Sequence, residues 1–119
     1  MLSEYESKVD IIHGDSEKLS QQIPSNSFDI VLDIESSFYY PNKLSFLREV
    51  YYAMKDDGLF IFGFYIQETQ LPEIYDYINR FFTVVKAEDV TENAIKSLKL
   101  DRESVVNYCD THYPWCKSY

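Results

Sequence analysis

The feature that most constrains this chain is an apolar run at residues 59–66, in which polar and apolar side chains do not alternate. In a strand with one face in water, polar and apolar side chains alternate. A strand of a parallel sheet has helices on both faces and therefore reads as a continuous apolar run. The run predicts a buried strand of a parallel sheet, with helices packed on either side of it.

Three further segments, at residues 9–13, 28–34 and 82–87, also predict strands. They are short and rich in β-branched or aromatic side chains, which favour extended structure. The segment at 28–34 has the composition of a strand that is covered on both faces.

Helical spacing of apolar residues separates these predicted strands. Between residues 42 and 55 the spacing is i, i+3, i+4, i+7, and we expect this helix to end near Gly58 in the left-handed conformation. Helical patterns follow at 72–81, 89–98 and 104–109, and a weaker one lies at 16–22. The alternation predicts one α/β domain over residues 1–119.

Composition excludes several classes of function. The chain has 119 residues and a formal net charge of −9, and so negative a surface repels phosphate backbones. We expect no nucleic-acid partner. No apolar run approaches the roughly 20 residues of a membrane helix. The acidic start of the chain does not resemble a secretory signal, so we expect a cytoplasmic protein without a membrane partner.

Three soft-metal ligands, Cys109, His112 and Cys116, lie close together near the end of the sequence. A structural zinc usually takes four ligands in tighter pairs, and the fourth would have to be distant His13 or a carboxylate. We expect ordinary burial of these side chains and no metal. A small zinc-stabilised module is the alternative.

Carboxylates follow two of the predicted strands, where open α/β sheets bind their ligands. Asp15 comes directly after the first strand, and Asp33 and Glu35 close the second. Such carboxylates accept hydrogen bonds from amino groups, but an Asp in a turn also commonly satisfies backbone N–H groups. The aromatic residues of the next loop, 38–40, either line a small-molecule pocket or cap the core.

Five segments occur in an order that resembles the C-terminal two-thirds of a class I S-adenosylmethionine-dependent methyltransferase of the small-molecule, type-11 kind. The segments are IHGDSEKL at 12–19, IPSNSFDIV at 23–31, ESSFYYPN at 35–42, FLREV with MKDDGLF at 46–60, and AEDVTEN at 87–93. The similarity covers about residues 9–100. It implies a partial Rossmann-like sheet of mainly parallel strands with flanking helices.

The resemblance also implies a cofactor, S-adenosylmethionine, and a set of site residues. Asp15 would hold the adenine amine, with Ser16 beside the ring. Ile34 and Glu35 would lie along the methionine part of the cofactor. Tyr39 takes the position where relatives often carry His, and would orient the acceptor or act as an acid or base. The acceptor would be the nitrogen or oxygen of a small molecule.

One departure from the family pattern concerns the start of the sheet. The family's first strand, its glycine-rich loop and its ribose-binding acid should precede Val9, where eight residues are available. The strand at 28–34 would then expose an unpaired apolar edge. We expect an incomplete domain. Either its edge pairs with a second copy or another subunit, or the strand predicted at 9–13 moves in beside it. The alternative to catalysis is a non-catalytic binding or scaffold module.

Overall fold

The computed structural model of this chain describes residues 8–112. The chain forms two compact units, the first ending at Val84 and the second beginning at Val85. Four of the five segments that resemble the family lie within the first unit, and the fifth, at 87–93, lies in the second. The prediction of one domain over residues 1–119 stays a prediction.

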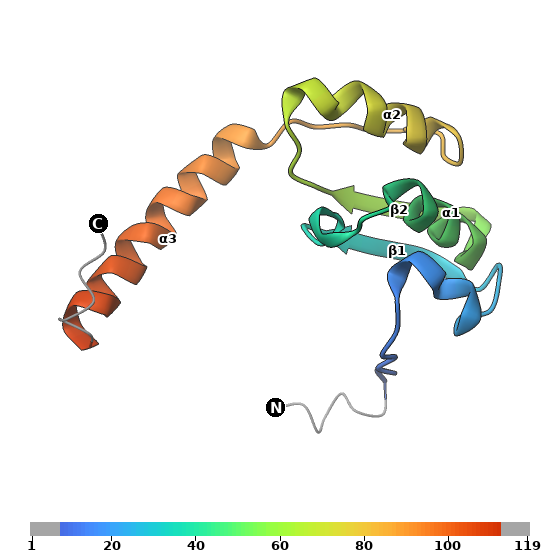
Figure 1. The fold of residues 1–119 in the computed structure, drawn as a ribbon, viewed down its shortest axis with the longest axis horizontal. Helices are drawn as coiled ribbons and strands as arrows, with labels where there is room; N and C mark the ends of the chain where they lie inside the picture. Colours follow the sequence, from blue (N-terminus) through green and yellow to red (C-terminus); the bar gives the residue numbers. More distant parts are fainter. Residues whose placement is uncertain (1–7, 113–119) are drawn as a thin grey trace. The chain divides into compact units, whose positions relative to one another are not determined.

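A parallel pair of strands forms the sheet of the first unit, β1 (Phe28–Ile34) and β2 (Met54–Gly63). Ile30 lies opposite Leu59 and Ile34 opposite Gly63, so the two strands end at the same edge (Figure 1). The α/β class and the parallel arrangement are therefore confirmed, and so is the strand predicted from the apolar run, although it begins five residues earlier.

Helix α1 (Lys43–Ala53) connects the two strands. It begins where the Asn42 side chain accepts a hydrogen bond from the Ser45 N–H at 2.9 Å, which satisfies one of the free donors of the first turn. The prediction that the helix ends near Gly58 was wrong. Met54 is already extended and enters β2 directly.

Gly58 does not take the left-handed conformation that we expected of it, since no glycine among the described residues has a positive φ. Instead, the absence of a side chain at Gly58 allows neighbouring backbone atoms to approach it closely. A Cβ at this position would lie 2.9 Å from the Lys55 carbonyl oxygen and 3.2 Å from that of Asp29. The missing side chain lets the start of β2 press against β1, at the place where the register between the strands is irregular.

A second helix, α2 (Leu71–Asn79), follows β2 through the 3-10 turn η3 (Glu68–Gln70), close to its predicted position. Two further 3-10 segments, η1 (Ser16–Gln21) and η2 (Ser37–Tyr39), flank β1. The weak helical pattern at 16–22 is thus realised as η1.

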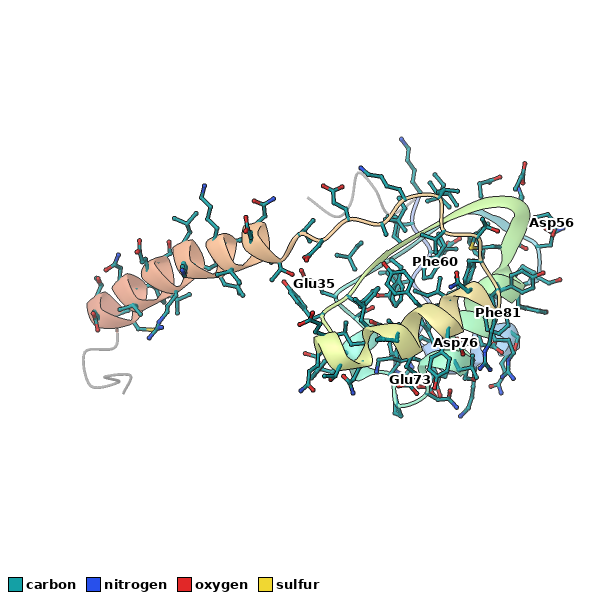
Figure 2. The ribbon with its side chains drawn as sticks, turned by 90° about the horizontal axis from the view of Figure 1, so that it is seen from above. Glu35, Asp56, Phe60, Glu73, Asp76 and Phe81 are labelled. Carbon is teal, nitrogen blue, oxygen red and sulfur yellow. The ribbon has the colours of Figure 1, made fainter. Side chains whose placement is uncertain are left out.

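The core lies between one face of the sheet and the two helices. Its fully or nearly buried members are Phe46, Leu47, Val50, Met54 and Ile74, from α1, the start of β2 and α2. The inward side chains of the strands, Val31, Phe60 and Phe62, pack against this cluster, and Figure 2 shows Phe60 beside α2.

The opposite face of the sheet is bare, which corrects the expectation that both strands are covered on both faces. Six large apolar side chains on this face are between 40% and 65% exposed: Phe28, Ile30, Leu32, Ile34, Leu59 and Ile61. Within the first unit both helices pack against the other face, so nothing described there covers these side chains.

Two predicted strands were wrong, those at 9–13 and 82–87, because neither segment finds a strand to pair with among the described residues. Ile11 is 91% exposed. Phe82 instead packs against the core, with its ring centroid 5.2 Å from that of Phe60. The four-stranded sheet implied by the sequence is thus a two-stranded one within residues 8–112.

The second unit contains α3 (Thr91–His112), one continuous helix where the sequence predicted two short ones at 89–98 and 104–109. Its side chains are largely exposed, including the apolar side chains of Ile95 and Leu98. None of the helices in residues 8–112 has the length and apolar character to cross a membrane.

Candidate functional site at the strand ends

The carboxyl ends of the two strands meet at one rim, because the strands are parallel. The Glu35 N–H donates to the Gly63 carbonyl at 2.7 Å and so extends the ladder one step beyond β1. Figure 2 shows Glu35 at the end of the strands opposite to Asp56. Ile34, which ends β1, is 56% exposed at the same rim.

Glu35 is held in the left-handed conformation, with φ +61°, which is costly for a residue with a side chain. The Tyr65 hydroxyl, just beyond β2, donates to Glu35 Oε1 at 3.1 Å. This hydrogen bond raises the pKa of Tyr65, since loss of the phenol proton would place two negative charges together. The backbone here is thus strained at a predicted cofactor residue.

Asp33 is almost fully buried beside this loop. Its Oδ1 accepts from the Ser36 hydroxyl at 2.7 Å, and the Tyr40 hydroxyl lies 2.8 Å from the same Ser36 oxygen. Asp33 Oδ2 has no hydrogen-bond partner in the described part of the chain. The chain of contacts from Asp33 to Tyr40 fixes the loop that carries Glu35.

Asp15 begins η1 as its N-terminal cap. Its Oδ1 accepts from the Glu17 N–H at 2.9 Å and its Oδ2 lies 3.3 Å from Lys18 Nζ. The backbone hydrogen bond from Glu17, and then the Lys18 ammonium, lower the pKa of Asp15. Both partners are exposed, so the ion pair is weak and open to exchange. Ser16 is the first residue of η1.

Glu17 links the two predicted corners of the site. Its Oε1 accepts from the Asn42 N–H at 2.7 Å, and its carbonyl oxygen accepts from the Ser45 hydroxyl at 3.3 Å. Asn42 caps α1, the helix that follows the β1 loop. The start of η1 is therefore bonded to the start of α1, at the end of the unit where β1 finishes. Sequence analysis missed Glu17, because a hydrogen bond between residues 25 apart leaves no local pattern.

The three loop aromatics divide between the two roles that the sequence left open. Tyr40 packs on Phe46 with ring centroids 4.5 Å apart and so covers the core. Phe38 and Tyr39 are 72% and 78% exposed and contact each other edge to face. Their rings stand at the rim, where a ligand could meet them.

The family model for the methyltransferase domain, type 11, matches residues 2–62 of this chain. The match takes in η1, β1, α1 and nearly all of β2. The chain belongs to this methyltransferase family. No protein of curated function matches the sequence significantly.

The segment that the family model matches contains each predicted site residue, namely Asp15, Ser16, Ile34, Glu35 and Tyr39. It ends at Phe62, so the resemblance of residues 87–93 to the family stays a prediction. The roles of the five residues also stay predictions.

Two hollows of the first unit lie away from the predicted site residues. One has a volume of about 80 Å³ and is lined by Lys43, Ile74 and Tyr77 among others, and a second has about 250 Å³ and is lined by Leu44 and Phe81 among others. Pockets for small ligands usually have about 300–1,000 Å³. None of the predicted site residues lines either hollow. A cofactor at the rim would rest against an open surface made of η1 and the β1 loop.

No group of three or more metal-ligating side chains lies together within residues 8–112. Cys109 is a free thiol on α3, and His112 stacks on Tyr108 one turn away. Cys116, the third ligand considered for zinc, lies outside the described residues.

Proposed function

We propose that this chain binds S-adenosylmethionine at the rim formed by η1 and the β1 loop, and takes part in methyl transfer to the nitrogen or oxygen of a small molecule. The observation that carries the proposal is the family match over residues 2–62, which includes both corners of the rim. A cytoplasmic location belongs to the same proposal, in keeping with the free thiol at Cys109.

The chemistry of the rim fits the cofactor's donor groups. Asp15 and Glu35 are carboxylates, which accept hydrogen bonds from amines, and Glu35 Oε1 is already positioned by Tyr65. The exposed rings of Phe38 and Tyr39 are suited to lie against a sulfonium, because ring faces attract cations.

In this proposal Asp15 accepts the adenine amine, Ser16 lies beside the ring, and Ile34 and Glu35 line the methionine portion. The cofactor supplies a methyl group on a sulfonium, which an acceptor amine or hydroxyl attacks in line. Tyr39 positions the acceptor. Such a displacement depends mostly on alignment and on exclusion of water, so it does not need a strong base from this chain.

Calorimetric titration with S-adenosylmethionine tests the proposal. We expect binding in the micromolar range, weakened about tenfold by Asp15→Ala through loss of the amine contact. Asp76 is a carboxylate on α2, far from the rim in sequence. Asp76→Ala is therefore the matched control and should bind S-adenosylmethionine as tightly as the parent. No heat and no thermal shift at millimolar cofactor would contradict the proposal.

A second candidate function, a non-catalytic module that pairs with another chain, rests on one observation. Among the described residues β1 has β2 as its sole neighbour, so its outer edge offers unpaired backbone groups. A strand of a complete methyltransferase subunit, or of a second copy, would complete the ladder. A protein that fails to bind cofactor, but whose β1 amides become protected from hydrogen exchange when a partner is added, would support this function instead.

A further inference from the structure

Within the first unit, the bare face of the sheet is about as large as the largest apolar surfaces that monomers usually present to water. It consists of the six side chains named above, from Phe28 to Ile61, and none of them is charged. A fully exposed large apolar residue presents roughly 200 Å². At exposed fractions of 40% to 65%, the six side chains present about 600 Å², the upper end of the range for the largest patches on monomers.

We propose that a second copy of this chain packs its own bare face against this one, so that two sheets stack face to face about a two-fold axis. Two such faces together would bury about 1,200 Å², the lower end of a specific interface. Stacked sheets pack with interleaved side chains about 10 Å apart, and an apolar sheet face is complementary to itself.

Pairing of the sheets along the β1 edge does not solve the same problem. A two-fold axis normal to the sheet leaves both bare faces on the same side of the joined sheet. The apolar surface exposed to water would then double. Face-to-face packing is the arrangement of two copies that removes the six side chains from water.

Charge also favours a second copy over an oppositely charged partner. The chain has a net charge of −9, yet the six side chains of the face are uncharged. A basic partner would find no charged group among these six to pair with. Two acidic copies repel at long range, and salt screens that repulsion. Association of two copies should therefore strengthen as salt is raised, whereas an ion-paired complex should weaken.

Sedimentation velocity on the full chain, from about 1 μM to about 500 μM, tests the proposal. We expect a monomer–dimer equilibrium with a dissociation constant in the micromolar range. Leu32→Lys should raise that constant at least about tenfold, because it buries a charge at the centre of the interface. Tyr52→Lys adds the same charge within the first unit, at a side chain of α1 that is 41% exposed. Because α1 packs against the other face of the sheet, this variant should leave the constant unchanged.

Leu32 is 65% exposed in one copy, so the Lys variant should fold, and its far-UV circular dichroism should match that of the parent. Fluorescence of a dye that binds apolar surface gives an independent readout on the unmodified chain, and should fall per molecule as concentration rises. A monomer at all concentrations would overturn the proposal. So would a dimer that Leu32→Lys leaves intact, which would point to pairing through the β1 edge.

Discussion

Glu35 meets opposing demands from backbone geometry and from the proposed site. Its left-handed backbone, at φ +61°, is a conformation that glycine adopts without steric cost. Its side chain, in contrast, accepts from Tyr65 and faces the rim where we place the cofactor. Strain of this kind persists at functional sites when the surrounding contacts enforce it. Here those contacts are the Glu35–Gly63 backbone hydrogen bond and the buried Asp33–Ser36 pair.

Replacement of Glu35 separates these two demands. Glu35→Gly should raise the free energy of unfolding by about 0.5–1 kcal/mol, because the steric penalty is removed. The same variant should weaken S-adenosylmethionine binding. Urea denaturation measures the first effect and calorimetry the second.

Glu35→Gln is the control for this pair of effects, since it keeps both the side-chain length and the backbone strain. It should gain no stability. A glycine variant that is less stable and binds cofactor as tightly as the parent would contradict both halves of this account.

Acid should destabilise the fold through carboxylates whose pKa is lowered in the native state. Asp15, Asp29 and Asp89 are such groups, held by Glu17 N–H, by Lys55 and by Thr91 respectively. A carboxylate whose pKa is lowered in the native state stabilises the fold at pH values above its ordinary pKa of 3.8. That stabilisation is lost as the pH falls through the lower pKa of the native state. The melting temperature should therefore decline below about pH 4.

Asp15→Asn tests the share of Asp15 in this decline. Asparagine still caps a helix but does not titrate, so its melting temperature should fall less steeply with acid than that of the parent. Differential scanning calorimetry from about pH 2.5 to about pH 7 gives both curves. Identical slopes would show that the native hydrogen bond to Glu17 does not perturb Asp15.

At the scale of elements, α1 holds the first unit together. It connects the two strands and supplies most of the buried side chains, of which Leu47 is fully inaccessible to solvent. Its N-terminal cap, Asn42, donates its N–H to Glu17 of η1. Ser20 N–H also donates to Glu49 Oε2 at 2.7 Å, which fixes the end of η1 against this helix. Loss of packing in α1 should therefore disturb the sheet and the rim together.

Leu47→Ala should lower the free energy of unfolding by about 2–5 kcal/mol, through lost burial and the cavity that remains. In a chain of this size that is a large part of the total stability. Leu98→Ala on α3 removes the same atoms from a side chain that is 60% exposed, and should cost far less. Urea denaturation compares the two, and equal losses would place the core elsewhere.

The elements that sequence predicted correctly are those whose signal is local. The spacing of Leu47, Val50 and Tyr51 indicated α1, and the continuous run around Phe60 indicated a strand with a parallel partner. The segments at 9–13 and 82–87 have the composition of strands, but a strand also needs a neighbour, and that depends on the rest of the sheet. Composition cannot report a missing neighbour.

The same limit applies to burial and to the site. Leu32 and Ile61 lie in apolar segments typical of buried strands and yet are on a bare face, because burial depends on which helices pack against the sheet. Asp15 and Glu35 were found from their places after apolar runs. The strain at Glu35, the buried Asp33–Ser36 pair and the link from Glu17 to Asn42 involve three-dimensional contacts that no spacing shows.

For the whole molecule, the central claim is that the corner at Asp15–Ser16 and the corner at Ile34–Glu35 hold one cofactor. The Glu17–Asn42 hydrogen bond and the common end of the parallel strands support it. The bare sheet face concerns assembly and can be tested without cofactor, so the two claims stand or fall separately.

Titration of the ¹⁵N-labelled chain with S-adenosylmethionine, followed by amide chemical shifts, tests the central claim most directly. We expect the amides of Asp15, Ser16 and Glu35 to shift together along one saturation curve, while those of Glu73 and Asp76 on α2 stay in place. Shifts confined to one corner, or no shifts at millimolar cofactor, would contradict a shared site.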